Sequence, residues 1–402
     1  MRNNIVSNRR IRMQGLKNKL SSANSIELPP VTKHVLDYPL LIAVICICAF
    51  GIIMLFSASY YYAELYLHDG MHYVRTQLVY LIVGICAMYG ISHIPYTFYS
   101  KPIVYWGMYA LLIVLLVAVL LVGSTLQGAQ RWLNLGFFSL QPSELSKFVL
   151  AILMAALMTK YRQRLSSFSW LVILGLLMAV PAVLIFLQPN LSMIIILVLN
   201  FIILALVGGC SWKQIGVCGL IGVVSIVVYL KLKGNYQSER FAMATMSWEE
   251  LQKLSGDGAF QIVQSLYAFA NGGLFGQGFD ASRQKLLFLP YRESDYILPI
   301  IAEELGFVAV LLLMLAYFFV VYRGLKIARD CKERFGSLLA VGMTIALAVQ
   351  VLINAAVVSK LLPATGQTLP FISSGGTSLL SFLMSIGVLL NVSRYTEKHK
   401  VK

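Results

Sequence analysis

The sequence predicts an all-α polytopic membrane protein with ten transmembrane helices, and three observations support this prediction. Mean hydropathy is +0.77, and 58% of the residues are hydrophobic. Only 12% are charged, whereas soluble chains carry roughly a quarter charged residues. About ten apolar runs are each long enough to cross a hydrocarbon layer of ~30 Å as a helix. These features exclude an ordinary soluble domain.

The apolar runs also give the order and orientation of the helices. Most lysines and arginines fall in cytoplasmic segments if the N-terminus is inside, so the positive-inside rule predicts that both termini are cytoplasmic. Residues 1–36 would then form a basic N-terminal arm, 37–394 the membrane domain and 395–402 a cytoplasmic tail. The expected spans lie near 39–57, 78–94, 103–123, 142–159, 168–187, 190–208, 214–231, 295–322, 336–359 and 377–392.

The formal net charge of +15 raises the question of a nucleic-acid partner. The basic residues gather in short loops and in the N-terminal arm, where topology and attraction to anionic lipids account for them. We therefore predict no nucleic-acid binding. The six cysteines and five histidines have no metal-ligand spacing, and no Walker loop or Ser-His-Asp set is evident. The sequence carries no signature of a soluble enzyme.

Three long connections fall on the predicted outer face, at residues 124–141, 232–294 and 360–376. The second is a large extracytoplasmic loop between the predicted helices 7 and 8. Long connections without a domain of their own tend to be functional or disordered. We therefore expect the functional surface to face outward.

The first connection leads into "QPSELSKF", which begins a predicted helix. Glu144 and Lys147 are three residues apart and can meet on one helix face. An ionisable pair in a membrane helix is costly unless it faces the bundle or water. One interpretation is a structural pair that fixes the rotation of the helix. The other is a cationic site in which Arg131 and Lys147 receive anionic groups.

The third connection contains "LLPATGQTLPFISSGGTSLL" and is irregular at membrane depth. Such backbone is tolerated only where protein buries it or where it lines a cavity. Gly375 and Gly376 allow close approach of the backbone to a neighbour or a ligand. Ser373 and Ser374 supply donors that could hold phosphate or sugar oxygens. A tight structural turn before the last helix explains the same residues equally well.

The stretch "LPYRESDYILPIIAEELG" places carboxylates where a membrane helix begins. In one interpretation Ser294 or Asp295 caps that helix through a side-chain oxygen. In the other, Asp295 accepts a proton from a hydroxyl nucleophile while the upstream cations Arg283, Lys285 and Arg292 hold an anionic leaving group.

Glu303 and Glu304 lie about 12–14 Å deeper along the same predicted helix. That depth suits a buried structural pair or a proton-linked gate better than direct chemistry. Their role is left open by the sequence.

Together these stretches resemble the SEDS family of cell-wall polymerases (shape, elongation, division and sporulation). The resemblance covers about residues 37–394, with order and spacing kept, and is closer to the FtsW-like division and sporulation branch than to the RodA-like elongation branch. The matching pieces are "SAS" at 57–59, "GAQRWLNLG…QPSELSK" at 128–147, "QPNL" at 188–191, "GDGAFQIVQSLYAFANGGLFGQG" at 256–278, "LPYRESDYI…AEELG" and "LINAAVVSKLLPATGQTLPFISSGG".

The resemblance implies a peptidoglycan glycosyltransferase of the bacterial cytoplasmic membrane that polymerises lipid II on the outer face, in cell division by the favoured branch. It implies a class B penicillin-binding protein and other divisome proteins as partners, and it leaves open a divalent cation, Mg²⁺ or Mn²⁺. It carries the catalytic aspartate to Asp295 and cavity-lining positions to Arg131 and Lys147. Further substrate-binding candidates are Glu144, Arg283, Lys285, Ser373, Ser374, Gly375 and Gly376.

Three alternatives stay open at this point. A flippase or transporter of the lipid-linked precursor would use charges lining a cavity equally well. A polymerase of the elongation or sporulation branch is the second alternative, and a non-catalytic scaffold for a synthase partner is the third.

The chain also departs from the family pattern near the expected site. The departures are Tyr291 where the family has Glu, Glu293 and Ser294 where it has His-Thr, Asn190 for a common Asp, Asp280 for Gly, and Ser374 for Tyr.

Overall fold

A computed structural model describes residues 36–126, 129–134, 136, 139–217, 219, 242–243, 245–254 and 257–396. Nearly all of the predicted N-terminal arm, most of the predicted seventh span (214–231) and most of the predicted tail lie outside the described residues. The boundaries of the arm, membrane domain and tail therefore stay predictions.

The described chain is almost entirely helical, and nine of its helices are long and apolar enough to cross a membrane. These are α2 (Tyr38–Leu67), α3 (His72–His93), α4 (Pro102–Val122), α5 (Pro142–Lys160), α6 (Phe168–Leu187), α7 (Leu191–Gly208), α12 (Ile297–Asp330), α13 (Arg334–Val358) and α14 (Gly376–Arg394). The shorter helices are α10 (Trp248–Lys253), α11 (Asp257–Gly272) and the 3-10 turns η1 (Tyr96–Ser100) and η2 (Arg162–Arg164).

Each of these nine helices coincides with a predicted span, so the prediction of an all-α polytopic membrane protein is confirmed. The count of ten and the full extent of the large outer loop stay predictions. Some helices extend beyond their apolar runs: α2 continues to Leu67 through "SYYYAELYL", and α12 continues to Asp330. Hydropathy marks only the part of a helix that lies in lipid, and the backbone stays helical beyond it where no proline or glycine stops it.

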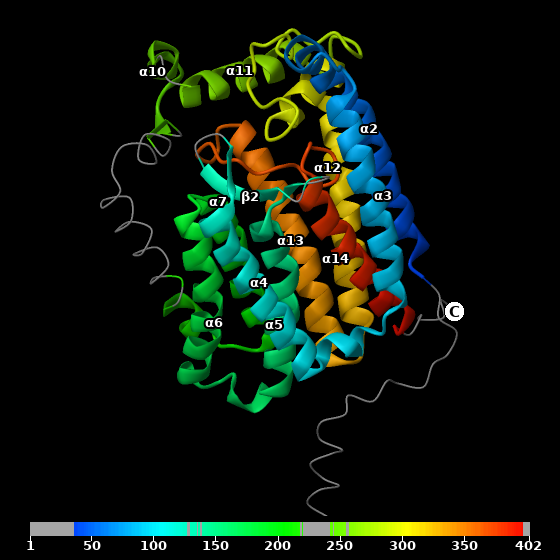
Figure 1. Cartoon of the computed structure of the whole chain (residues 1–402), viewed down its shortest axis with the longest axis vertical. Coiled ribbons are helices and arrows are strands. Elements are labelled where there is room, and N and C mark those ends of the chain that lie inside the picture. The colour runs from blue at the N-terminus through cyan, green and yellow to red at the C-terminus, as the bar shows by residue number, and fades with distance from the viewer. Residues whose placement is uncertain are drawn as a thin grey trace, which may run out of the picture. The chain divides into compact units, whose positions relative to one another are not determined.

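Three helices, α5, α13 and α14, form the enclosed part of the bundle. Between 72% and 89% of their most apolar windows are buried, against 22% to 44% for the other six spans. Figure 1 shows α13 and α14 between α2 and α3 on one side and α6 and α7 on the other. The enclosed helices carry many buried polar residues, among them Lys147, Gln350 and Ser381, which fits the rule that such residues in membrane helices face the bundle interior.

The connection before α5 is a small antiparallel sheet and not an open loop. It consists of β1 (Ser124–Leu126), β2 (Ala129–Asn134) and β3 (Ser139–Leu140), in the order β1-β2-β3. Leu133 of β2 pairs with Leu140 of β3 and is buried. This pairing fixes the register of β2, the strand that carries Arg131.

Helix α12 is interrupted at Gly306, which has φ 79° and ψ 178°. The segment 272–278 lies in the break. Two of its N–H groups donate to the carbonyl oxygens of Glu303 and Glu304, and two of its carbonyls accept from the residues after Gly306, at 2.9 to 3.1 Å. The inserted segment thus satisfies the backbone groups that the interrupted helix leaves without intrahelical partners.

Candidate active site

The main-chain carbonyl of Asp295 is held by a side chain of α13. The amide Nδ2 of Asn354 in α13 donates to the carbonyl oxygen of Asp295 at 2.9 Å and to that of Gln367 at 2.7 Å. Helix α12 begins after Tyr296, which occupies the N-cap position and makes no side-chain capping bond. Neither Ser294 nor Asp295 is therefore the N-cap, and the capping interpretation was wrong.

The two serines of the third connection fix the residues just before Asp295. Ser373 Oγ donates to the carbonyl oxygen of Ser294 at 2.5 Å and accepts from the N–H of Leu369 at 2.8 Å. The N–H of Ser374 donates to the carbonyl oxygen of Glu293 at 2.8 Å. In this arrangement Ser373 holds backbone with its hydroxyl and Ser374 with its main chain, and Ser373 is buried.

The side chains of Asp295 and Arg131 converge on Gly366. A Cβ atom built on Gly366 would lie 3.2 Å from Oδ2 of Asp295 and 4.0 Å from Nη1 of Arg131. The absence of a side chain at Gly366 therefore opens the space that both groups face. A carboxylate and a guanidinium directed at one small space form a candidate reaction centre.

Arg131 is positioned by two main-chain carbonyls. Its Nε donates to the carbonyl oxygen of Gln188 at 3.0 Å, and its Nη2 donates to that of Pro189. Both acceptors lie in the turn between α6 and α7. These bonds occupy one edge of the guanidinium and direct its Nη1 end toward Gly366. The sheet and the α6–α7 turn together therefore aim the positive charge at Asp295.

Uncharged polar groups surround this centre. Gln367 Nε2 donates to Asn190 Oδ1 at 3.4 Å. In the part of the chain that the structure describes, five buried polar atoms here have no hydrogen-bond partner. They are Gln188 Oε1, Asn190 Nδ2, Asn354 Oδ1, Thr365 Oγ1 and Gln367 Oε1. Leaving buried polar groups unpaired costs about 1–3 kcal/mol each, so these atoms mark a region suited to water or to substrate hydroxyls.

Sequence reasoning missed Asn354, Gly366 and Gln367 as site residues. A weak signal existed, because Asn354 is an amide within an otherwise apolar span and such residues are expensive in membranes. The pairing of this span with the turn before α12 depends on tertiary packing. The sequence gives no indication of that pairing.

The predicted pair of Glu144 and Lys147 is deeply buried. Lys147 Nζ lies 2.6 Å from Glu144 Oε2 and 2.5 Å from Gln350 Oε1, and it stands 4.2 Å from the ring centroid of Phe382. Lys147 is 2% exposed. Gln350 in turn donates to the carbonyl oxygen of Thr368 at 3.0 Å. This arrangement favours the structural interpretation, in which the pair anchors the loop that carries Gly366.

Lys285 lies in a second buried cluster. Its Nζ donates to Ser57 Oγ at 2.9 Å, to Glu304 Oε1 at 2.9 Å and to Asp280. These bonds use all three N–H donors of the ammonium group, so none is left for a leaving group in this arrangement. Arg283, by contrast, is exposed.

Glu303 and Glu304 anchor the loop that precedes α12. Glu303 accepts hydrogen bonds from Asn271 Nδ2 and the N–H of Gln284, each at 3.1 Å, and from Ser282. Glu304 is completely buried and binds Lys285. Both carboxylates are fully engaged with loop residues, which favours a structural role over a proton-linked gate.

Gly375 and Gly376 approach protein neighbours. A Cβ atom on Gly376 would lie 2.2 Å from the ring of Tyr80, and one on Gly375 would lie 2.9 Å from the side chain of Thr368. Tyr80 then donates to the carbonyl oxygen of Ser139 at 2.8 Å. The close approach inferred from these glycines therefore joins α14 to α3 and the sheet.

Comparison with known proteins identifies the family of this chain. The sequence pattern of FtsW, RodA and SpoVE, described as "Cell cycle protein", matches residues 38–398. The chain belongs to the FtsW/RodA/SpoVE family. This match covers the whole described membrane region, and the resemblance seen in the sequence motifs is confirmed.

Several members of the FtsW/RodA/SpoVE family are similar over almost their full length. Stage V sporulation protein E of Bacillus subtilis is 36% identical over 365 residues, covering 90% of this chain and 97% of that protein. The probable peptidoglycan glycosyltransferase FtsW of Trichlorobacter lovleyi is 35% identical over 362 residues, covering 89% and 93%. Relatives from the sporulation and division branches match about equally, so the choice of branch stays a prediction.

Solved structures of the FtsW/RodA/SpoVE family have the same fold. A chain from a peptidoglycan synthase complex that coordinates polymerization and crosslinking superposes with a TM-score of 0.73 at 25% identity, covering 90% of this chain and 98% of that chain. The rod shape determining protein RodA of Thermus thermophilus gives a TM-score of 0.64 at 23% identity, covering 91% and 99%. The chain is thus a multi-pass membrane protein, and the cytoplasmic placement of its termini stays a prediction.

The donor set around Asp295 does not fit a protein-held metal ion. Among the described residues, no group of three or more His, Cys, Asp or Glu side chains is placed to bind one. Asp295 shares its space with the guanidinium of Arg131, and a cation there would be repelled. The expectation of Mg²⁺ or Mn²⁺ stays a prediction.

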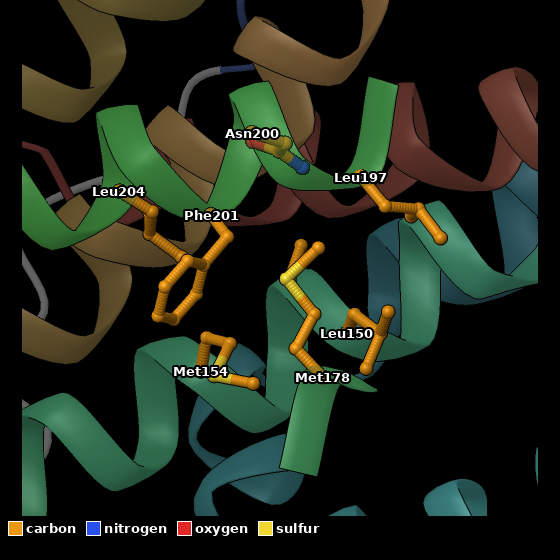
Figure 2. Close-up of a pocket in the computed structure, with 8 residues that line it drawn as sticks. Leu150, Met154, Met178, Leu197, Asn200, Phe201 and Leu204 are labelled. Atoms are coloured by element: carbon orange, nitrogen blue, oxygen red, sulfur yellow. The ribbon is translucent and has the colours of Figure 1, made fainter. Parts of the chain in front are cut away.

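A separate apolar pocket is lined by side chains of α5, α6 and α7 (Figure 2). Its lining is almost wholly aliphatic, aromatic or thioether side chains, so it suits hydrocarbon and not phosphate. The lining residues are Leu150, Ala151, Met154, Met178, Leu197, Asn200, Phe201 and Leu204.

Proposed function

We propose that this chain is a peptidoglycan glycosyltransferase that polymerises lipid II into glycan strands on the outer face of the cytoplasmic membrane, in cell division. The observation that carries the proposal is the convergence of Asp295 and Arg131 on the space beside Gly366. The family supports it, since relatives at 33–36% identity are named probable peptidoglycan glycosyltransferases or a sporulation protein.

In the proposed reaction, the 4-hydroxyl oxygen of one lipid-linked disaccharide attacks the anomeric carbon of the growing chain. The hydroxyl proton passes to the carboxylate of Asp295. The bond from the anomeric carbon to the pyrophosphate oxygen breaks, and its electron pair leaves with the polyprenyl pyrophosphate. Attack from the side opposite the leaving group inverts the anomeric centre.

Arg131 would stabilise the charge that develops on the leaving pyrophosphate. A guanidinium fixed by two carbonyl bonds is preorganised, so little free energy is spent on orienting it during the reaction. The unpaired amide atoms of Asn190, Asn354 and Gln367 would then hydrogen-bond the hydroxyl and acetamido groups of the sugars. In this proposal Asp295 acts as the base, Arg131 stabilises the negative charge of the leaving group, and the amide side chains orient the sugars.

The proposed partner is a class B penicillin-binding protein, which would cross-link the new glycan, together with other divisome proteins. A solved relative of similar fold belongs to a peptidoglycan synthase complex. Transport of the lipid-linked precursor is the rival function, and the ion pairs deep in the bundle would be its charged residues.

The test is polymerisation of labelled lipid II by the full chain in proteoliposomes, alone and with a class B penicillin-binding protein. Glycan strands longer than the substrate disaccharide are expected in at least the paired sample. A parallel assay follows the movement of labelled lipid II between leaflets. Movement of lipid II between the leaflets without any glycan product would contradict the polymerase function and support the transporter function.

A further inference from the structure

Arg292 is a buried cation whose hydrogen-bonding capacity is largely unused. It is 3% exposed, and its guanidinium stands 4.7 Å from the ring centroid of Tyr62. Nη1 donates to the carbonyl oxygen of Leu289 at 3.0 Å. Its Nε and Nη2 are buried and have no hydrogen-bond partner within the described ranges.

The two unpartnered atoms lie on the same edge of the guanidinium. Their N–H bonds run nearly parallel, which is the geometry that binds a phosphate or carboxylate through two hydrogen bonds. Arg131 uses the corresponding edge for the carbonyls of Gln188 and Pro189. Arg292 keeps this edge without a protein partner.

One carboxyl group and three tyrosines face Arg292 among the described residues. The groups that face it are Glu293 and the tyrosines Tyr62, Tyr66 and Tyr73. Burial raises the pKa of Glu293, and the charge of Arg292 partly opposes that rise. Among the described residues, no carboxylate lies within ion-pair distance of Arg292. A buried, unpaired charge is strongly unfavourable, so the site is arranged for an anion from outside the chain.

Arg292 and Arg131 belong to opposite sides of the bundle. Arg292 packs on Tyr62 of α2, whereas Arg131 is held by the turn between α6 and α7. Figure 1 shows these helix pairs on either side of α13 and α14. Asp295 follows Arg292 by three residues and meets Arg131 at Gly366. The base therefore has one guanidinium toward α6 and α7 and another toward α2 and α3.

We propose that Arg292, with the ring of Tyr62 as one wall, forms a second anion site that binds the pyrophosphate of a second lipid-linked substrate. The inference rests on the proposed function, because chain growth requires two lipid-linked pyrophosphates at one base. Arg131 holds the pyrophosphate that leaves, and Arg292 holds the pyrophosphate of the attacking substrate, which is retained.

The segment 286–291 leads directly into Arg292, and the carbonyl oxygen of Leu289 in this segment accepts the hydrogen bond from Nη1. Leu287 and Tyr291 have positive φ values of 71° and 56°, which are unfavourable for residues with a side chain. Leu286 and Phe288 are exposed. A strained segment with exposed side chains shifts at lower free-energy cost than a fully packed one, so we expect this segment to move when the anion binds.

The test counts bound lipid II in an Asp295→Asn background, in which we expect substrate to bind without turnover. Native mass spectrometry of this full chain in nanodiscs should show two lipid II molecules per protein. Adding Arg292→Met should leave one, and adding Arg131→Met should also leave one. Arg75→Met, at an exposed arginine paired with Asp69, is the matched control and should keep two.

A variant that retains the charge covers the case in which Arg292→Met does not fold. Arg292→Lys loses the two-donor edge and should bind the second lipid II at least about tenfold more weakly. Two molecules bound with unchanged affinity in both Arg292 variants would overturn the second site, as would a single molecule bound by the Asp295→Asn parent. The polymerisation assay above uses unmodified protein, so it judges the proposed function separately.

Discussion

The side-chain amide of Asn354 donates to the main-chain carbonyl of Asp295 at 2.9 Å and to that of Gln367 at 2.7 Å. One buried side chain thus joins α13, the turn before α12 and the loop that carries Gly366. The position of the proposed base depends on this bridge because Asp295 lies outside regular helix.

Replacing Asn354 with alanine should misplace Asp295. We expect glycan polymerisation to slow by on the order of 100-fold, since small errors in the position of a reacting group have effects of this size. Thermal unfolding should show that the unfolding free energy falls by about 1–3 kcal/mol. Asn391→Ala is the matched control, because Asn391 bridges Tyr96 and Ser92 at the other end of α14. It should lose similar stability without the same loss of rate, and equal loss of rate in both variants would count against the bridge.

The buried cluster of Lys285 and Glu304 should act on stability. Lys285→Met leaves Glu304 buried without its cation, and removal of one partner of such a pair costs about 3–5 kcal/mol. The double variant Lys285→Met with Glu304→Met should recover most of that loss. Thermal unfolding measures both, with Lys253→Met at an exposed lysine as the control. A Lys285→Met protein of normal stability and weakened lipid II binding would restore the substrate-binding interpretation of Lys285.

The sequence predicted the helices well because hydropathy over a span is a local property. The motif around Asp295 was also visible, and the structure places Asp295 and Arg131 beside Gly366. The sequence did not show which charged side chains face the site and which are buried in ion pairs. The spacing indicated the pair of Lys147 and Glu144 on one helix, but it did not indicate that Gln350 of α13 closes over Lys147 or that Glu304 of α12 binds Lys285.

The break in α12 makes Gly306 the least replaceable glycine of that helix. Its φ and ψ values belong to a region open essentially to glycine alone, and an added Cβ would meet backbone atoms of the inserted segment at 2.4 Å. Gly306→Ala should therefore cost at least about 3 kcal/mol in thermal unfolding. Gly175→Ala in α6, with no atom within 4 Å, should be neutral or stabilising. Similar stability of the two variants would contradict the insertion.

Glu293 should make stability depend on pH. Burial raises its pKa above the ordinary value of 4.5. The folded state then holds this proton more tightly than the unfolded state. The unfolding free energy should fall as pH rises from about 4.5 through the raised pKa and should level off above it. Glu293→Gln should flatten this part of the profile in thermal unfolding, while Glu333, whose pKa burial also raises, continues to contribute. An unchanged slope would show that Glu293 titrates normally.

The role of Asp295 as the base is tested most directly by single-turnover polymerisation of labelled lipid II with Asp295→Asn. The control is Asp69→Asn, in the turn between α2 and α3. The exchange keeps the shape of the side chain and removes its ability to take a proton. We expect no glycan from a folded Asp295→Asn protein that still binds lipid II, and normal glycan from Asp69→Asn. Polymerisation by Asp295→Asn at the rate of the unmodified chain would contradict the assignment.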